Sequence, residues 1–144
     1  MADAEIHAAL ATFDRAFAAG DADALAERFA VDARLLLLHL PEIQGRDAIR
    51  EHWAAGFARH DTSAWRTDWE IVDHHDDRAT GLAVYSETLV PRGDGPRSIV
   101  NGRVVLFLQR EADGEWRVTI AMNSHWIPIE RVEPEPGASE PGVT

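Results

Sequence analysis

The hydrophobic period of the chain changes once, near residue 65, and this change limits the folds that the sequence can adopt. Residues 3–60 carry apolar side chains mostly at helical spacing, as in Ile6, Leu10 and Phe13. From residue 65 onward, apolar residues alternate with polar ones in about four segments separated by turn residues. Helices that precede a run of antiparallel strands predict an α+β domain, with the helices packed on one face of a curved sheet.

The order of the first elements follows from local signals. Helices are expected over residues 3–19, 22–29 and 46–60, and a buried strand over residues 35–40. Gly20 separates the first two helices, because glycine readily ends a helix. One domain is expected over residues 1–130. The remaining segment, 131–144, is acidic and rich in Pro and Gly, which predicts a disordered tail.

Charge and composition exclude several classes of function. The 25 Asp and Glu residues outnumber the 14 basic residues, all of them Arg, and the formal net charge is −11. This balance argues against a nucleic-acid partner, which needs clustered basic residues. The absence of cysteine excludes disulfides and a cysteine nucleophile. No apolar run approaches the roughly 18 residues of a membrane span, and no signal peptide is recognised, so a cytoplasmic protein without a membrane partner is expected.

The segment EWRVTIAMNSHWIP, residues 115–128, has one apolar face and a polar end. Strand periodicity places Asn123 and His125 on the same face. The opposite face carries four apolar side chains, which are Trp116, Val118, Ile120 and Met122. The polar end could simply face solvent, or it could line a binding pocket.

Three motifs, in this order, resemble the nuclear transport factor 2-like superfamily, which includes the ketosteroid isomerases and the SnoaL-like polyketide cyclases. They are AFAAGDADALAERFAVDA (16–33), IQGRDAIREHW (43–53) and DGEWRVTIAMN (113–123). The segment WRVTIAMNSHWIP (116–128) looks most like the SgcJ/EcaC-type branch. The resemblance covers residues 3–128. It implies a cone-shaped, curved antiparallel sheet wrapped around three N-terminal helices, with a pocket in the open end of the cone.

The resemblance also implies which side chains contact a ligand. The expected ligand is a hydrophobic small molecule. The binding residues are expected to be Phe13, Phe17, Phe29, Leu37, Trp53, Tyr85, Asn123 and Trp126. The candidate catalytic residues are Glu87, His125 and His39. A carboxyl group in an apolar pocket, or an imidazole, can move a proton near neutral pH.

Each candidate catalytic residue also has a structural interpretation. Glu87 could face solvent or pair with Arg103 on a neighbouring strand, and a histidine at a strand end could be satisfied by the backbone. Together, His39, His125 and Glu87 could form a two-histidine, one-carboxylate metal site. That arrangement needs three side chains from three strands to converge, so no metal or other cofactor is expected.

The groups that carry ketosteroid isomerase chemistry are absent. That branch uses a carboxylate on the first strand, a tyrosine on the first helix and a protonated acid on a later strand. Motif spacing places Leu37, Phe13, and Leu106 or Phe107 at these positions. The usual ketosteroid isomerase mechanism is therefore excluded.

The sequence predicts a small-molecule pocket protein. We expect a cofactor-independent isomerase, cyclase or hydratase that acts on a hydrophobic, oxygenated metabolite such as a polyketide. A non-catalytic ligand-binding or carrier protein of the same fold is the alternative, and a partner-binding dimer with a vestigial pocket is the third. If Asn123 and His125 face the cone interior, the Trp116–Met122 face points outward and predicts a homodimer packed through the sheets.

Overall fold

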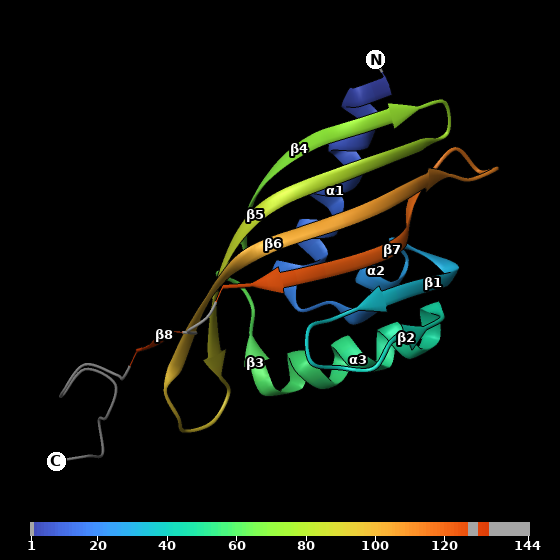
Figure 1. Cartoon of the computed structure of the whole chain (residues 1–144). Coiled ribbons are helices and arrows are strands. Elements are labelled where there is room, and N and C mark those ends of the chain that lie inside the picture. The colour runs from blue at the N-terminus through green and yellow to red at the C-terminus, as the bar shows by residue number, and fades with distance from the viewer. Residues whose placement is uncertain (1, 127–129, 133–144) are drawn as a thin grey trace, which may run out of the picture.

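The computed structural model of the chain describes residues 2–126 and 130–132, and Figure 1 shows how its elements are arranged. The helices are α1 (Ala2–Ala19), α2 (Ala22–Ala26) and α3 (Arg46–Arg59). The strands are β1 (Phe29–Leu36), β2 (Ile43–Gln44), β3 (His60–Asp61), β4 (Arg66–His75), β5 (Arg78–Pro91), β6 (Arg97–Arg110), β7 (Trp116–His125) and β8 (Glu130–Val132).

The sheet confirms the predicted α+β class, with one difference in strand direction. Its order is β2-β1-β7-β6-β5-β3, with β4 also paired to β5 and β8 to β6. The strands from β4 to β7 pair antiparallel, whereas β1 and β7 run parallel, so the sheet is mixed rather than antiparallel throughout. Residues 133–144 of the predicted tail lie outside the described residues.

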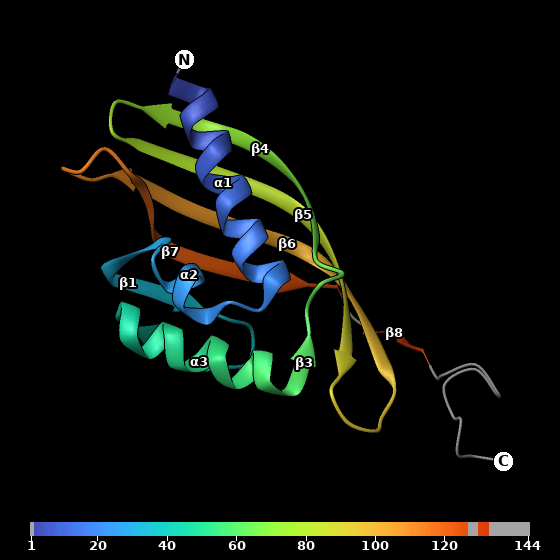
Figure 2. The same cartoon turned by 180° about the vertical axis from the view of Figure 1, so that it is seen from behind.

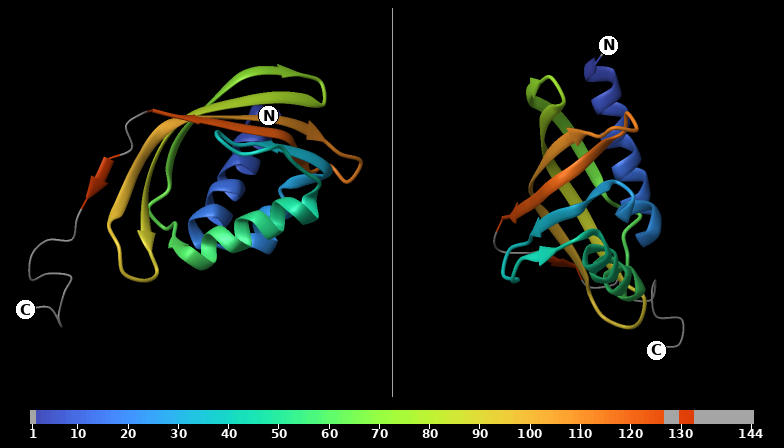
Figure 3. Two further views of the ribbon diagram at one scale, coloured as in Figure 1. Left: turned by 60° about the horizontal axis from the view of Figure 1, so that its bottom comes forward. Right: turned by 90° about the vertical axis from the view of Figure 1, so that its right-hand side faces the viewer.

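The sheet curls around the helices. Helix α1 crosses its concave face (Figure 2), and α3 lies along the edge formed by β1 and β2. Seen from the end, the long strands β5 and β6 bend around the helices to form one side of a cone (Figure 3). The helical spacing in α1 predicted the buried face, because Ile6, Leu10, Phe13 and Phe17 all lie in the core.

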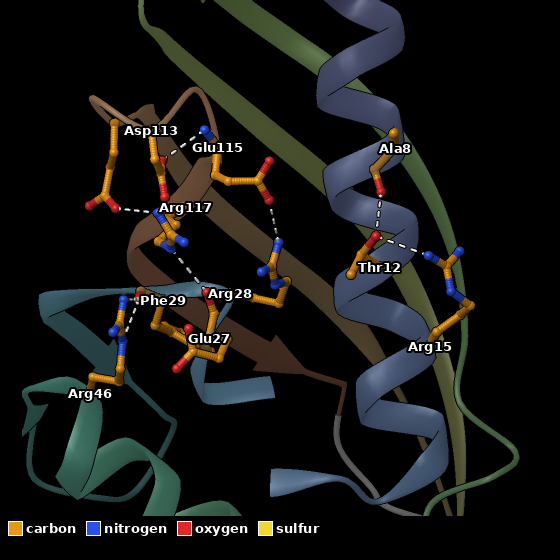
Figure 4. A network of polar contacts seen from close by, with 11 residues as sticks. Ala8, Thr12, Arg15, Glu27, Arg28, Phe29, Arg46, Asp113, Glu115 and Arg117 are labelled. Carbon is orange, nitrogen blue, oxygen red and sulfur yellow. Dashed lines mark hydrogen bonds and ion pairs between the residues drawn. The ribbon is translucent and has the colours of Figure 1, made fainter. Parts of the chain in front are cut away.

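The second helix is shorter than predicted, because β1 begins earlier. Phe29, expected at the end of that helix, is the first residue of β1 and pairs with Val118 of β7. An arginine network holds this junction (Figure 4). Arg46 of α3 donates two hydrogen bonds, of 2.9 and 2.7 Å, to the Phe29 carbonyl. Arg117 of β7 donates one of 3.1 Å to the Glu27 carbonyl. These bonds fix the start of β1 between α3 and β7.

A β-bulge in β7 shifts the alternation of buried and exposed side chains by one residue. Val118 pairs with Leu108 and Ile120 with Phe107, so Thr119 is the extra residue. Before the bulge, Trp116 and Val118 are 4% and 1% exposed and belong to the core. After it, Ala121 is buried and Met122 is 42% exposed. The prediction that Trp116–Met122 form one outward apolar face is therefore wrong.

Strands β6 and β7 approach each other closely at Gly102. A Cβ atom there would lie 2.2 Å from the Ser124 carbonyl oxygen and 2.6 Å from the His125 Cα. Both contacts are with backbone, which cannot rotate away. We therefore expect Gly102→Ala to lower the free energy of unfolding by about 1–3 kcal/mol, measured by urea denaturation. Gly93→Ala is the control, because nothing lies within 4 Å of a Cβ at Gly93. Equal stability of the two variants would contradict the prediction.

Among residues 2–126 and 130–132, none of the helices has the length and apolar character that crossing a membrane requires.

Candidate active site

A cavity of about 240 Å³ lies between the concave face of the sheet and the helices α1 and α3. Its floor is apolar and aromatic, with Phe13 and Phe17 from α1 and Phe29 and Leu35 from β1. Strands β5, β6 and β7 supply the opposite wall. The cone-shaped sheet and the helices that cover it therefore create a largely apolar cavity that is open at one side.

Most of the predicted site residues line this cavity. The structure brings together Phe13, Phe17, Phe29, Leu37, Trp53, Tyr85, Glu87 and Asn123. They come from two helices, three strands and, for Leu37, the turn after β1, all of which are distant in sequence. His39, His125 and Trp126 are not among the lining residues.

The predicted placement of the two catalytic histidines is wrong. Strand β1 ends at Leu36, and the following turn places His39 at a φ of 70°, so His39 does not continue the strand. His125 lies two residues beyond Asn123, which moves it about 7 Å along β7, past the cavity wall. The two imidazole rings lie near each other outside the cavity, with centroids 6.1 Å apart.

Trp126 also lies outside the cavity, and the three candidate metal ligands do not come together. Trp126 is exposed, and the Arg103 guanidinium carbon lies 5.3 Å from its ring centroid. Because Glu87 lines the cavity and His39 and His125 do not, the two-histidine, one-carboxylate arrangement is not assembled. Across the described ranges, no group of three His, Asp or Glu side chains is placed to hold a metal ion.

Glu87 is the buried acid of the cavity. It lies on β5 opposite Val100 of β6, and only 9% of the residue is exposed. Within the part of the chain that the structure describes, its Oε2 atom has no hydrogen-bond partner. Burial, which disfavours the charged form, raises the pKa of Glu87 to about 7. The carboxyl group therefore exchanges its proton near neutral pH.

Tyr85 and Asn123 form a polar pair beside this carboxyl group. Tyr85 lies two residues before Glu87 and so faces the same side of β5. Burial raises the pKa of Tyr85, a hydrogen bond with Asn123 opposes this, and the charge of Glu87 adds to it. The Oδ1 atom of Asn123 also accepts a 3.3 Å hydrogen bond from the Leu38 backbone N–H, which orients the amide.

Asp14, a carboxylate outside the cavity lining, fixes the position of aromatic side chains next to the cavity. Asp14 of α1 accepts hydrogen bonds from Trp65 (2.8 Å), Thr67 (2.6 Å) and Trp69 (2.8 Å). Trp65 in turn packs against Tyr85, with ring centroids 5.0 Å apart. The bonds to Asp14 therefore position an aromatic ring that supports Tyr85.

The sequence analysis missed several lining residues on and after α3. They are His52, Gly56, Phe57, Arg59, His60, Thr62 and Trp65. The spacing of His52, Gly56 and Arg59 at i, i+4 and i+7 places them on one helix face, and this signal could have identified them. Burial, with a smaller effect of the Arg59 charge, lowers the pKa of His52. Trp53 lines the same region, and within the described residues its buried Nε1 atom has no partner.

Comparison with known protein families identifies the domain. The family model described as a SnoaL-like domain matches residues 1–121, which is most of the chain. This chain belongs to the SnoaL-like domain family. No curated protein sequence matches it.

Solved structures show that this SnoaL-like fold recurs at low sequence identity. A ketosteroid isomerase-like protein from Erwinia carotovora atroseptica is 22% identical, with a TM-score of 0.77 over 87% of this chain and 96% of its own. A candidate scytalone dehydratase from Novosphingobium aromaticivorans is 16% identical, with a TM-score of 0.76 over 93% of each chain. A hexachlorocyclohexane dehydrochlorinase from Novosphingobium barchaimii is 11% identical, with a TM-score of 0.77 over 91% and 90%. At these identities the likeness establishes the fold alone.

The polar groups of this SnoaL-like cavity differ from those of the usual ketosteroid isomerase mechanism. Phe13, Leu37 and Leu106, where the resemblance implies the reactive groups of that enzyme, all line the cavity as apolar side chains. The polar groups of this SnoaL-like cavity are instead Tyr85, Glu87 and Asn123 on the strands, and His52, Arg59 and His60 on and directly after α3.

Proposed function

We propose that the protein is a cofactor-independent enzyme that transfers a proton on a hydrophobic, oxygenated small molecule, with Glu87 as the acid/base. The observation that carries the proposal is Glu87 itself. A carboxyl group lines an apolar cavity, one of its oxygens lacks a partner among the described residues, and its pKa is raised to about 7. A group with this pKa can both take and return a proton at neutral pH.

A reaction sequence for these groups is straightforward. Glu87 takes a proton from a carbon next to a carbonyl group, and the electron pair of the C–H bond moves toward the carbonyl oxygen. Tyr85 and Asn123 stabilise the resulting oxyanion by hydrogen bonds. If a C=C bond adjoins the deprotonated carbon, return of the proton to the far end of that bond completes an isomerisation. Loss of a leaving group from the neighbouring carbon instead completes an elimination, and Glu87 passes its proton to the departing group or to water. The names of two structural relatives, a dehydratase and a dehydrochlorinase, are in keeping with elimination.

The polar atoms of the cavity lining favour a ligand that contains oxygen atoms. The Trp53 N–H and the Glu87 Oε2 are both buried, and neither has a partner within the described residues. Because both atoms are fully buried, an oxygenated ligand would satisfy them if its binding displaced the side chains that cover them, as buried polar groups require. An apolar cavity of about 150 Å³ accepts benzene, so one of about 240 Å³ suits on the order of ten non-hydrogen atoms. A bicyclic ring, such as a small polyketide contains, has this size.

The test uses a compound that reports any general base in an apolar pocket. In 5-nitrobenzisoxazole, a base takes the proton from C3, the N–O bond breaks, and a coloured nitrophenolate forms. Its rate of formation is measured with wild-type protein and with Glu87→Gln. Turnover by the wild type that depends on Glu87 supports the enzyme. Binding without turnover would instead support the alternative, a carrier protein for the same kind of ligand.

We further propose that the protein forms a homodimer through the outer face of its sheet. Phe107 and Met122 are 38% and 42% exposed, and the partly buried side chains of Ile120, Val105 and Leu82 connect them across the sheet to the exposed Val84 of β5. Single exposed apolar residues are ordinary, but a contiguous group favours association. This face differs from the predicted one, because the bulge in β7 turns Trp116 and Val118 into the core.

The dimer is tested by light scattering after gel filtration. We expect a mass of twice 16.0 kDa for the wild type and 16.0 kDa for Phe107→Glu. A charge at the centre of an apolar contact would lose its hydration without gaining a partner, so it should separate the subunits. Ala54→Glu is the control, because it adds the same charge at an exposed position of α3, outside the sheet. A wild-type mass of 16.0 kDa in dilute solution would exclude the dimer.

A further inference from the structure

The cavity has an apolar floor and a basic mouth. The side chains of its floor, including Phe13, Phe17 and Phe29, are fully or almost fully buried. Its more accessible lining residues include His52 and Arg59 from the last three turns of α3 and His60 immediately after that helix. The open side of the cavity therefore presents one guanidinium and two imidazole groups to an entering molecule.

Arg59 is the most accessible of these groups and is available for a ligand. None of the side-chain hydrogen bonds or ion pairs within residues 2–126 involves it, whereas Arg34, Arg110 and Arg117 each pair with carboxylates. Arg59 follows His52 by seven residues, about two helical turns, on the same face of α3, and its charge helps to lower the pKa of His52. A guanidinium with free N–H groups matches the two oxygens of a carboxylate.

The acidic residues near the mouth do not neutralise Arg59. Asp61, which follows His60, instead accepts a 2.8 Å hydrogen bond from the Ser63 backbone N–H, and this bond, with a smaller effect of the Arg92 charge, lowers the pKa of Asp61. Glu87 lies deeper in the cavity, and its pKa, raised to about 7, leaves it about half ionised at pH 7 and largely uncharged below that pH. The protein carries a net charge of −11, so an uncompensated arginine gives the region beside the apolar cavity a positive charge that differs from the overall charge of the protein.

We propose that the ligand of this cavity carries an anionic group, most simply a carboxylate, which binds Arg59 at the mouth with His52 and His60 beside it. This inference rests on the proposed function and specifies its substrate class. The ring of the ligand fills the apolar part of the cavity, next to Tyr85 and Glu87. The substrate is thus an aromatic or alicyclic acid with a ring system of about ten atoms, in keeping with the 240 Å³ of space.

Two isosteric probes separate charge from shape. 1-Naphthoate and 1-naphthamide share a ten-carbon ring system and differ in one charge. Their dissociation constants are measured by titration calorimetry with the full chain at pH 7. We expect 1-naphthoate to bind the wild type about tenfold more tightly than 1-naphthamide, because a charge-assisted bidentate pair is stronger than a neutral hydrogen bond.

Variants then assign the preference to Arg59. Arg59→Gln should weaken 1-naphthoate binding about tenfold and change 1-naphthamide binding less than twofold, and Arg59→Lys should restore part of the loss. Arg78→Gln is the matched control. It removes the same charge from an exposed position at the start of β5, outside the cavity lining, and should leave both dissociation constants unchanged.

The alternative role for Arg59 is structural, since a basic side chain in the last turn stabilises the C-terminal end of a helix. In that case Arg59→Gln would weaken both probes equally, and the proposal would be overturned. Equal binding of the two probes by the wild type would also overturn it, while the cavity would remain a ligand site. If neither probe bound, both this inference and the proposed ligand cavity would be wrong.

Discussion

Glu87→Gln is expected to lower the rate of nitrophenolate formation from 5-nitrobenzisoxazole by about 10²–10⁴-fold, the usual contribution of a positioned acid or base. Glutamine keeps the shape of the side chain and its carbonyl oxygen, but it cannot take a proton. Binding should be nearly unaffected, so the dissociation constant of 1-naphthamide should change less than about threefold. The change in rate without a change in affinity is the signature of a catalytic group.

The pH dependence gives this prediction a second readout. Only the ionised carboxylate acts as a base, so the wild-type rate should rise with pH and level off above about pH 7, the pKa to which burial raises Glu87. A rate that levels off near pH 4.5 would mean that the carboxyl group is solvated. Glu70→Gln is the control, because it makes the same substitution on β4 at an exposed position outside the cavity. If both variants kept the wild-type rate, Glu87 would not be the base.

The hydrophobic pattern predicted the helices and the sheet because burial and local spacing agree there. Ile6, Leu10, Phe13 and Phe17 are one helix face in the sequence and one core face in the structure. The same applies to Tyr85 and Glu87, whose two-residue spacing places them on one side of β5. The parallel pairing of β1 with β7 was not predicted, because strand direction depends on how the chain returns across the sheet.

The errors occur where a local irregularity changes the direction of a side chain. The alternation of Trp116, Val118, Ile120 and Met122 is unbroken in the sequence, so the bulge at Thr119 leaves no sign in it. The apolar run around Leu37 predicts a strand, but the chain turns after Leu36 and carries His39 away from the cavity. The His39 placement assumed that β1 continues past Leu36, whereas His125 lies within β7 but beyond the cavity along that strand.

Between pH 4.5 and 7, we expect the wild type to lose stability relative to Glu87→Gln. The pKa of Glu87 is about 7 in the folded state and near 4.5 in the unfolded chain. In this interval the folded state binds more protons than the unfolded state, so the free energy of unfolding falls as pH rises. The difference between the two proteins should be small at pH 4 and should reach about 3 kcal/mol in favour of Glu87→Gln above pH 7.

The measurement is urea denaturation of both proteins at several pH values. All other titrating groups are common to the two proteins, so their effects cancel in the difference between the free energies of unfolding. Glu70→Gln, at its exposed position, should show no such trend with pH. A constant difference between wild type and Glu87→Gln from pH 4 to 8 would mean that the folded state does not hold Glu87 in its protonated form.

The stability and rate predictions share one physical cause. The apolar cavity withholds water from Glu87, which destabilises its ionised form in the folded protein and makes that form a stronger base. A site shaped only for packing would gain stability from glutamine, or from an apolar residue, at this position. A buried carboxyl group whose Oε2 atom has no partner within the described residues costs stability, and a proton-transfer function explains this cost, since activity and instability above pH 7 then arise from the same side chain.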